Sequence, residues 1–262
     1  MNRLDRIVES TRKRMAEQES RKPLGKIREE AEKKGVYKGP SFFEALRGEG
    51  MSMICEVKRA SPSKGVIAPD FPYLKIAKAY ERGGAAAISC LTEPFYFQGS
   101  DRYLEEIAKS VSLPILRKDF IISPYMIYEA RLMGAAAVLL ICAILTDEEL
   151  SAFLGLAHSL GLAVLAETHT EEEVRRAARA GARIIGINNR DLTSFTVDLG
   201  TSERLAALVP EGAIWVSESG IHHHEDVKRC AGWGASGILV GERLMRDPDP
   251  EKAVGRLLYG ED

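Results

Sequence analysis

The sequence is poor in the features that mark secreted, membrane and metal-binding proteins. It holds four cysteines, which lie far apart and form no CxxC motif. Three of them fall in apolar runs, where a free cysteine behaves as a small hydrophobic residue. No stretch approaches the roughly eighteen uncharged apolar residues of a membrane helix, and the first residues include no apolar signal segment. We therefore expect a cytoplasmic protein that is not inserted in a membrane.

The chain also has little net charge. Its formal charge is −2, although 28% of its residues are charged, so neither sign dominates the surface. Basic residues near the start are interspersed with glutamates, as on a solvated helical surface. Nucleic acid is therefore not an expected partner. The sequence has no GxxxxGK[ST] motif, which excludes a nucleotide P-loop.

A repeating pattern of helix and strand runs through most of the chain. Four segments have a helical stretch that ends in glycine and alanine and passes directly into an apolar strand, with marker glycines Gly84, Gly134, Gly181 and Gly234. Glycine is the preferred residue just after a helix. The markers are about fifty residues apart, roughly twice the minimum length of a βαβ crossover. Each interval therefore holds two strand–helix units.

Apolar and β-branched runs bring the number of expected strands to eight. Most of these runs are apolar throughout, which indicates strands buried on both faces of a parallel sheet. Eight strand–helix units predict a single domain, residues 1–262, folded as a (β/α)8 TIM barrel. An open doubly wound sheet is the alternative, because periodicity does not distinguish closed from open sheets. The expected strands are 53–57, 86–91, 114–117, 136–142, 162–166, 184–187, 213–217 and 237–240.

The residues before the first strand form an N-terminal helical extension, residues 1–50. Helices are expected near 4–19, 25–34 and 42–46. Such an extension can plug the bottom of the barrel or lie as a lid over its top, and the pattern leaves both arrangements open.

Charged and polar side chains gather at the ends of the apolar strands. Glu56 and Lys58 are two residues apart at the end of the first strand, so their side chains point the same way. Lys118 and Phe120 repeat this spacing after the third strand. Barrel enzymes place their active sites at these strand ends. A salt-bridge network that only closes the barrel is the alternative, although apolar layers would do so at lower cost. Further strand-end residues are Glu167, Asn188, Arg190, Glu218, Ser219, Gly241 and Glu242.

Two glycine-containing segments predict a phosphate site. SESGI follows the seventh strand and LVGERL the eighth. They place backbone N–H groups where barrels commonly bind phosphate, beside a short helix N-terminus. Ser61, in the loop after the first strand, adds a hydroxyl.

Three consecutive histidines, His222, His223 and His224, raise the question of a metal. Consecutive side chains diverge and no HExxH motif accompanies them, so we interpret the run as a surface segment that caps the next helix. His158 and His169 show no informative pattern. We therefore expect chemistry without metal, nucleotide or flavin.

These motifs resemble those of the indole-3-glycerol phosphate synthase family of tryptophan biosynthesis. The resemblance covers essentially the whole chain; EVKRASPSKG and PILRKDF are its most specific segments, joined by AETHT, GINNRDL, VSESGI and VGERLM in family order. It implies a (β/α)8 barrel with extra N-terminal helices and no cofactor. The implied enzyme is a carboxy-lyase that closes the pyrrole ring of 1-(2-carboxyphenylamino)-1-deoxyribulose 5-phosphate, releasing carbon dioxide and water. Other enzymes of the tryptophan pathway are then candidate partners.

The resemblance also implies roles for single residues. Lys118 would protonate the ketone oxygen during ring closure, and Lys58 would hold the substrate carboxylate. Glu56 and Glu167 would move protons during dehydration, with acid and base left unassigned. Phe97 and Phe120 would contact the aromatic ring. The residues Asn188, Arg190, Glu218 and Ser219 would orient the substrate and catalytic groups, and the phosphate would rest on Ser61 and on the backbone at Ser219, Gly220, Gly241 and Glu242.

Three other functions fit part of the pattern. A Schiff-base aldolase also uses a strand-end lysine in a phosphate-binding barrel. Phosphoribosylanthranilate isomerase is a second candidate, but its acid–base chemistry is usually assigned to a Cys and an Asp, whereas the first strand here offers Glu56 and Lys58 beyond Cys55. A barrel that binds a metabolite without turnover is the third, and the number of charged side chains at the strand ends argues against it.

Overall fold

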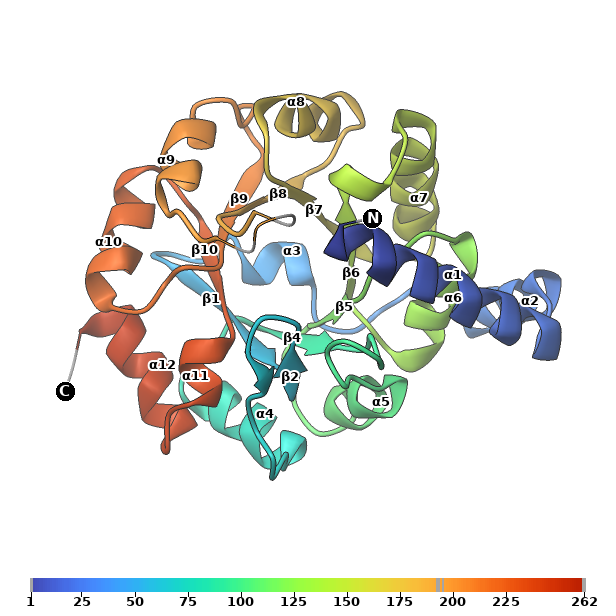
Figure 1. The fold of residues 1–262 in the computed structure, drawn as a ribbon, viewed down its shortest axis with the longest axis horizontal. Coiled ribbons are helices and arrows are strands. Elements are labelled where there is room, and N and C mark those ends of the chain that lie inside the picture. The colour runs from blue at the N-terminus through green and yellow to red at the C-terminus, as the bar shows by residue number, and fades with distance from the viewer. Residues whose placement is uncertain (1, 192–193, 195, 261–262) are drawn as a thin grey trace.

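The computed structural model describes residues 2–191, 194 and 196–260. Within them, eight parallel strands form a closed barrel in the order β1-β10-β9-β8-β7-β6-β5-β4 (Figure 1). Strand β1 pairs with both β10 and β4, which closes the sheet and excludes the doubly wound alternative. The strands are β1 Ser52–Val57, β4 Ala87–Leu91, β5 Ile115–Lys118, β6 Ala137–Ile141, β7 Ala163–Thr168, β8 Ile184–Asn188, β9 Ile214–Glu218 and β10 Gly237–Val240.

Helices between the strands form the outer ring in Figure 1. Two of them begin after a threonine. The hydroxyls of Thr146 and Thr170 accept hydrogen bonds from the backbone of the third helical residue, which satisfies an N–H that the helix leaves free. The helices are α4 Tyr73–Arg82, α5 Asp101–Ala108, α6 Pro124–Met133, α7 Asp147–Ser159, α8 Glu171–Arg179, α9 Gly200–Ala206, α10 His224–Gly232, α11 Glu242–Met245 and α12 Pro250–Tyr259.

The four marker glycines lie where the chain turns from helix to strand. Each has a positive φ, from +83° to +93°, a conformation that residues with a Cβ rarely adopt. Gly134, for example, is the left-handed C-cap of α6, and its N–H donates to the Ala130 and Arg131 carbonyls. The predicted use of glycine as a helix stop is confirmed at these positions.

Side chains on the barrel strands alternate between two cores. Outward residues such as Cys55 and Val57 pack under the helices, while inward residues such as Ile54 and Leu116 fill the barrel. Inward positions are two residues apart, so the next inward positions after Ile54 and Leu116 are Glu56 and Lys118. In the described part of the chain the lower barrel is therefore mainly apolar, and the charged groups Glu56 and Lys118 enter its interior at the upper end.

The N-terminal extension covers both ends of the barrel. It consists of α1 Arg3–Arg21, α2 Leu24–Lys34 and α3 Phe42–Ala45. Ile7 of α1 lines the cavity at the upper end, whereas the Ser52 hydroxyl at the start of β1 donates to the Ala45 carbonyl of α3 at 3.2 Å. Figure 1 shows α1 crossing in front of the barrel and α2 at the side, beside α6. The lid and the plug are thus separate helices of one extension.

One small element was not expected. Strands β2 Ala60–Ser61 and β3 Gly65–Val66 form an antiparallel hairpin directly after β1, in a segment where the sequence predicts only a loop.

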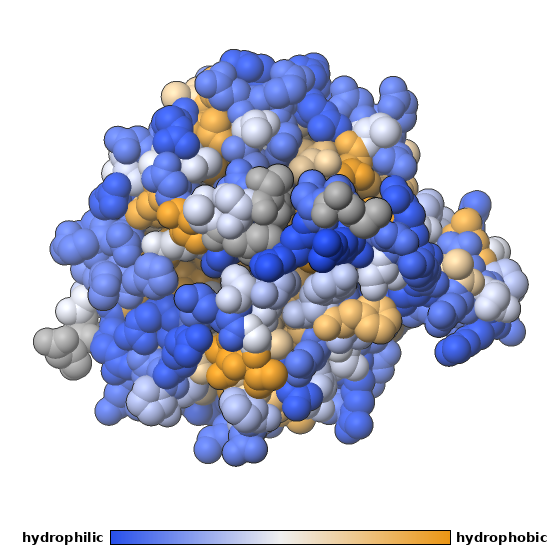
Figure 2. All heavy atoms as spheres, viewed as in Figure 1, coloured by the Kyte–Doolittle hydropathy of each residue, from blue (hydrophilic) through white to orange (hydrophobic). Residues whose placement is uncertain are grey.

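The surface of the molecule is mostly polar on the face that Figure 1 presents. Figure 2 shows that hydrophilic side chains predominate on this face and that hydrophobic ones form small, separated patches. No helix in the described part of the chain is long and apolar enough to span a membrane.

Candidate active site

A cavity opens at the carboxyl ends of the strands, and all fourteen residues that the sequence singles out lie around it. They come from β1, β5, β7, β8 and β9 and from the loops that follow the strands. Leu4 and Ile7 of α1 close one side. The strand-end residues therefore face one cavity and not several.

Lys118 of β5 lies between two carboxylates of the barrel interior. Its Nζ is 2.9 Å from Glu218 Oε2 and 3.3 Å from Glu167 Oε2. Burial lowers the pKa of Lys118, but Glu218, Glu167 and Glu56 outweigh this and raise it, so the group is an ammonium ion. Burial raises the pKa of Glu167 too, but Lys118 and His169 more than reverse this and lower it. Glu218 keeps a raised pKa of about 7, because burial and the Glu167 charge exceed the attraction of Lys118.

A second cation–carboxylate pair comes from β1, where Lys58 Nζ forms an ion pair with Glu56 Oε1. Gly241, after β10, makes room for it: a Cβ at this position would lie 3.0 Å from Lys58 Nζ and closer still to the Glu56 carboxylate. Gly186 on β8 makes room for Glu218 in the same way. Both glycines are therefore required by the charged groups beside them, and sequence reasoning overlooked Gly186.

The charged side chains at the strand ends do not satisfy all of one another's hydrogen-bonding groups. Glu218 Oε1 and Ser61 Oγ are buried and have no hydrogen-bond partner among the residues that the structure describes. Native proteins rarely leave buried polar atoms unpaired, and a network that served only to close the barrel would be destabilised by them. These unpaired atoms instead favour a site in which a bound ligand supplies the missing hydrogen-bond partners.

The predicted phosphate end has unusual backbone geometry. Ser219 and Gly220 both have positive φ, +67° and +81°, so successive N–H groups can converge on an anion. Asn189, which sequence reasoning missed, holds this turn by donating from Nδ2 to the carbonyls of Glu218 and Ser219, each at 3.0 Å. Its place in the GINNRDL motif was the available signal.

Glu242 and Arg190 complete this end of the cavity. The Glu242 carboxylate accepts a hydrogen bond from Arg246 Nε at 3.0 Å and lies 3.9 Å from Lys64 Nζ. It is therefore already engaged by cations, which favours an anion contact through the backbone. The backbone N–H of Arg190 donates to Asn188 Oδ1 at 3.0 Å.

An apolar wall stands opposite the phosphate end. The rings of Phe97 and Phe120 lie with centroids 6.1 Å apart, and Leu139 of β6 also lines the cavity. The loop that carries Phe97 is organised by buried Glu93, whose carboxylate accepts from the N–H groups of Tyr96 at 2.7 Å and Phe97 at 2.9 Å. Sequence reasoning did not single out Glu93, although it lies two residues after the expected strand 86–91.

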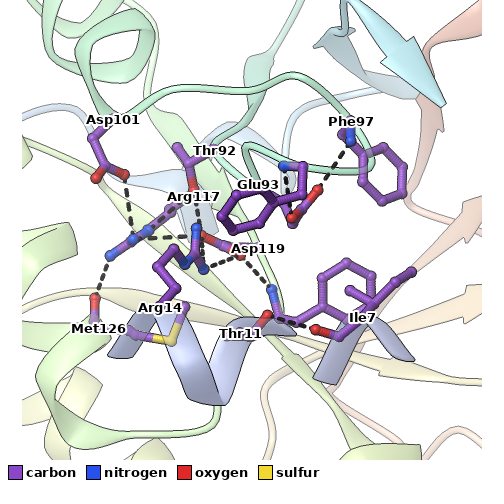
Figure 3. Close-up of polar contacts among 12 residues, drawn as sticks. Ile7, Thr11, Arg14, Thr92, Glu93, Phe97, Asp101, Arg117, Asp119 and Met126 are labelled. Carbon is purple, nitrogen blue, oxygen red and sulfur yellow. Dashed lines mark hydrogen bonds and ion pairs between the residues drawn. The ribbon is translucent and has the colours of Figure 1, made fainter. Parts of the chain in front are cut away.

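Helix α1 is tied to the segment that carries Lys118 (Figure 3). Arg14 Nη2 donates to Asp119 Oδ1 at 2.9 Å and to Oδ2 at 3.0 Å. Thr92 Oγ1 donates to the same carboxylate at 2.8 Å. Burial raises the pKa of Asp119, but Arg14 and Arg117 outweigh burial and lower it. Asp119 therefore remains charged and fixes the residues on either side of it, Lys118 and Phe120.

The three consecutive histidines lie at the start of α10. The backbone N–H groups of His222 and His223 each donate to Asp226 Oδ2 at 3.0 Å, which is the capping role expected for them. No group of three or more His, Cys, Asp or Glu side chains within residues 2–191, 194 and 196–260 has the geometry to hold a metal ion.

Comparison with known proteins identifies the family. The model of the family described as "Indole-3-glycerol phosphate synthase" matches residues 4–257. The chain belongs to the indole-3-glycerol phosphate synthase family. It is 48% identical to the indole-3-glycerol phosphate synthase of Lachnoclostridium phytofermentans, over 97% of this chain and 98% of that protein. It is 50% identical to that of Lacticaseibacillus paracasei, over 96% of both chains.

Membership in the indole-3-glycerol phosphate synthase family confirms the expected enzyme class, a carboxy-lyase of tryptophan biosynthesis that acts on a small phosphorylated substrate. It decides against the aldolase, the isomerase and the non-catalytic barrel. Among solved structures, 3-hexulose-6-phosphate synthase from Salmonella typhimurium is similar with a TM-score of 0.65 over 79% of this chain and 96% of that one. At 14% identity this similarity concerns the fold alone.

Proposed function

We propose that the cavity binds 1-(2-carboxyphenylamino)-1-deoxyribulose 5-phosphate in one orientation and that Lys118 starts its conversion to indole-3-glycerol phosphate. The observation that carries this proposal is the position of Lys118: a partly buried ammonium ion between two carboxylates, in the same cavity as a second lysine. An apolar wall bounds one end, and the turn at Ser219 and Gly220, where both residues have positive φ, bounds the other. The substrate has matching ends, an aromatic ring and a phosphate.

In the ring-closing step, an aromatic carbon attacks the ketone carbon of the sugar chain. The C=O electron pair moves onto oxygen and takes a proton from Lys118 Nζ, and a partly buried ammonium ion donates well once the bound substrate excludes water from it. Lys58, whose ammonium group lies across the mouth with Glu56, holds the substrate carboxylate until the C–C bond breaks. The electrons of that bond then restore the aromatic ring as carbon dioxide leaves.

Dehydration needs one group that accepts a proton from carbon and a second group that donates a proton to the departing hydroxyl, which leaves as water. We assign this base role to Glu167, since Lys118, His169 and Asn188 keep its carboxylate ionised. Glu56 is the second proton-transfer group. Asn188, Arg190, Glu218 and Ser219 orient the substrate, and the phosphate rests on Ser61 and the backbone of Ser219, Gly220, Gly241 and Glu242.

The test is to mix the purified protein with the carboxyphenylamino-deoxyribulose phosphate and follow indole fluorescence. We expect turnover that is unchanged after dialysis against a chelator, because the proposed proton transfers use side chains alone. Absence of indole would overturn the proposal. Borohydride trapping with a sugar phosphate is the companion experiment: a covalent adduct on Lys58 or Lys118 would favour Schiff-base chemistry instead.

We also propose a setting for this activity. The chain works as one domain, residues 1–262, in which residues 1–50 are the helical extension. Its four cysteines are buried free thiols, which suits the reducing cytoplasm. Other enzymes of the tryptophan pathway are its proposed protein partners, and co-purification of those enzymes with the tagged chain would test this.

A further inference from the structure

His169 follows β7 directly and lies between two carboxylates. Its Nε2 is 3.3 Å from Oε1 of Glu167, and its Nδ1 is 3.2 Å from Oε2 of Glu173. The side chain is 11% exposed. Sequence reasoning gave this histidine no role, although it lies in the AETHT segment.

Glu173 holds His169 through both main chain and side chain. The backbone N–H of His169 donates to Glu173 Oε2 at 2.8 Å, and the imidazole contacts the same oxygen. Glu173 is fixed in turn, because its own N–H donates to the Thr170 hydroxyl at the start of α8. The ring is therefore anchored on the side away from the cavity.

The two carboxylates favour the charged form of the ring. A neutral imidazole has a single N–H, so one of the carboxylates would face a nitrogen lone pair, whereas an imidazolium offers an N–H to each. Burial lowers the pKa of His169, but Glu167 and Glu173 outweigh it and raise the value to about 10. His169 Nε2 has no aligned hydrogen bond, so its contact with Glu167 is an ion pair.

We propose that His169 is a positioning residue for Glu167: anchored by Glu173, its imidazolium holds Oε1 of Glu167 so that Oε2 stays directed at Lys118. The inference rests on the base role proposed above for Glu167. Glu167 then has one cation beside each carboxylate oxygen: Lys118 on the cavity side and His169 on the side of α8.

Other charged groups act on the same chain of contacts. Lys118 and the Asn188 amide stabilise ionised Glu167, while Glu218 shares Lys118 with it. Around Glu173, the Arg176 guanidinium and the Cys142 thiol interact with the carboxylate. Because Lys118 still supports Glu167 when His169 is removed, we expect a shift of the proton equilibrium and not its abolition.

The first experiment reads the charge of His169 without using activity. Nitrogen-15 NMR of the histidine rings, with His169→Gln to assign the signal, should show both ring nitrogens of His169 protonated at pH 8. His158, exposed on α7, serves as the titrating reference. In Glu173→Gln the proton should be lost at lower pH. A neutral His169 at pH 8 would overturn the proposal whatever the enzyme's substrate.

The second experiment separates positioning from a structural role. In His169→Gln we expect an unchanged KM and a kcat roughly tenfold lower. The acid limb of the kcat–pH profile should move up by about one unit, since Glu167 loses an adjacent cation. His169→Lys should return the limb toward its original pH, and His158→Gln should match the wild type throughout.

The outcomes are distinguishable. A lower unfolding temperature with an unchanged pH profile in His169→Gln would show that His169 only supports the start of α8, and would overturn the inference. Failure of the proposed function looks different: the wild type would give no indole, or Glu167→Gln would turn over normally, while the NMR result for His169 would be unaffected.

Discussion

Strand β5 carries two adjacent cations that point to opposite faces of the barrel wall, buried Arg117 and partly buried Lys118. Arg117 points outward, under α5 and α6, and its side chain is 1% exposed. It donates to the Met126 carbonyl at 2.7 Å and to Glu129 at 3.2 Å. Its remaining contacts, from 3.3 to 3.4 Å, are with Asp101, Asp119 and Thr92 (Figure 3).

Lys118 points inward and has fewer partners. Its described hydrogen bonds go to Glu167 and Glu218, and an ammonium group has three N–H donors. Its side chain is 16% exposed, toward the cavity. Every N–H group of Arg117 has a protein acceptor, so its network is complete without a ligand. Lys118 keeps capacity to donate, which is what an acid needs.

The comparison predicts that Arg117→Met causes a large loss of stability. The substitution removes the guanidinium partner of Glu129 and leaves Asp119 with Arg14 as its cation, so unfolding in urea should show a loss of about 3–5 kcal/mol. Arg102→Met on the neighbouring exposed face of α5 is the control, with an expected change below about 1 kcal/mol. Near-native stability in Arg117→Met would show that the cluster is not structural.

Lys118→Ala should give the opposite result. We expect a folded protein whose kcat is lower by at least about a hundredfold, the effect of a lost general acid. Glu167→Ala should lose activity on the same scale. Circular dichroism and steady-state kinetics on the same preparations separate folding from turnover. If either variant turns over like the wild type, that residue takes no part in the mechanism.

The carboxylates beside the two cations should respond to pH in opposite directions. Glu218 has a raised pKa of about 7 against 4.5 unfolded, so its contribution to stability is complete below pH 4.5 and is lost as the pH rises through 7. Asp119 has a lowered pKa, so its contribution is present above its unfolded pKa of 3.8 and is lost in acid.

Urea unfolding at several pH values can measure this difference. As the pH rises from 4.5 to 7, Glu218→Gln should gain roughly 3 kcal/mol relative to the wild type, because the glutamine avoids the cost of ionising the buried acid. The deficit of Asp119→Asn should instead shrink toward acid pH. If the stabilities of the two variants, each relative to the wild type, changed with pH in the same way, the opposite pKa shifts of Glu218 and Asp119 would be wrong.

Local sequence patterns predicted the barrel and the contents of its mouth, because both follow from short-range geometry. The two-residue period of a strand is sufficient to turn Glu56 and Lys118 to the same interior as Ile54 and Leu116. Strand ends differed by a residue or two: β7 extends to Thr168, so Glu167 lies within the strand. Which carboxylate meets which lysine depends on barrel closure, and periodicity carries no such long-range information.

The ion pair between Arg14 and Asp119 is likewise a long-range contact that local sequence patterns do not predict. The two residues are 105 positions apart, and only the fold reveals that α1 reaches the end of β5. Asp119 accepts from Arg14 and from Arg117 and is the residue next to Lys118. Asp119 therefore connects the hydrogen-bond network of Arg117, outside the barrel, with the segment that carries Lys118 inside it.

Arg14→Gln probes this connection and should have the smallest effect. Asp119 keeps Arg117, Thr92 and the Phe120 N–H, so the expected loss of stability is about 1–2 kcal/mol. Arg12→Gln, exposed on the same helix, is the matched control and should leave stability and turnover unchanged. Arg14→Lys should recover part of the loss, because a single nitrogen of Arg14 makes both contacts.

Kinetics of the same variants decide what the connection does. If Asp119 fixes Lys118 for proton transfer, Arg14→Gln lowers kcat a few-fold with little change in KM, because the acid is misplaced while the binding groups remain. If kcat is unchanged and only the urea midpoint falls, the outer network supports the barrel wall without influencing the inner one. The separation between Arg117 and Lys118 would then be complete, with structure on one face of β5 and chemistry on the other.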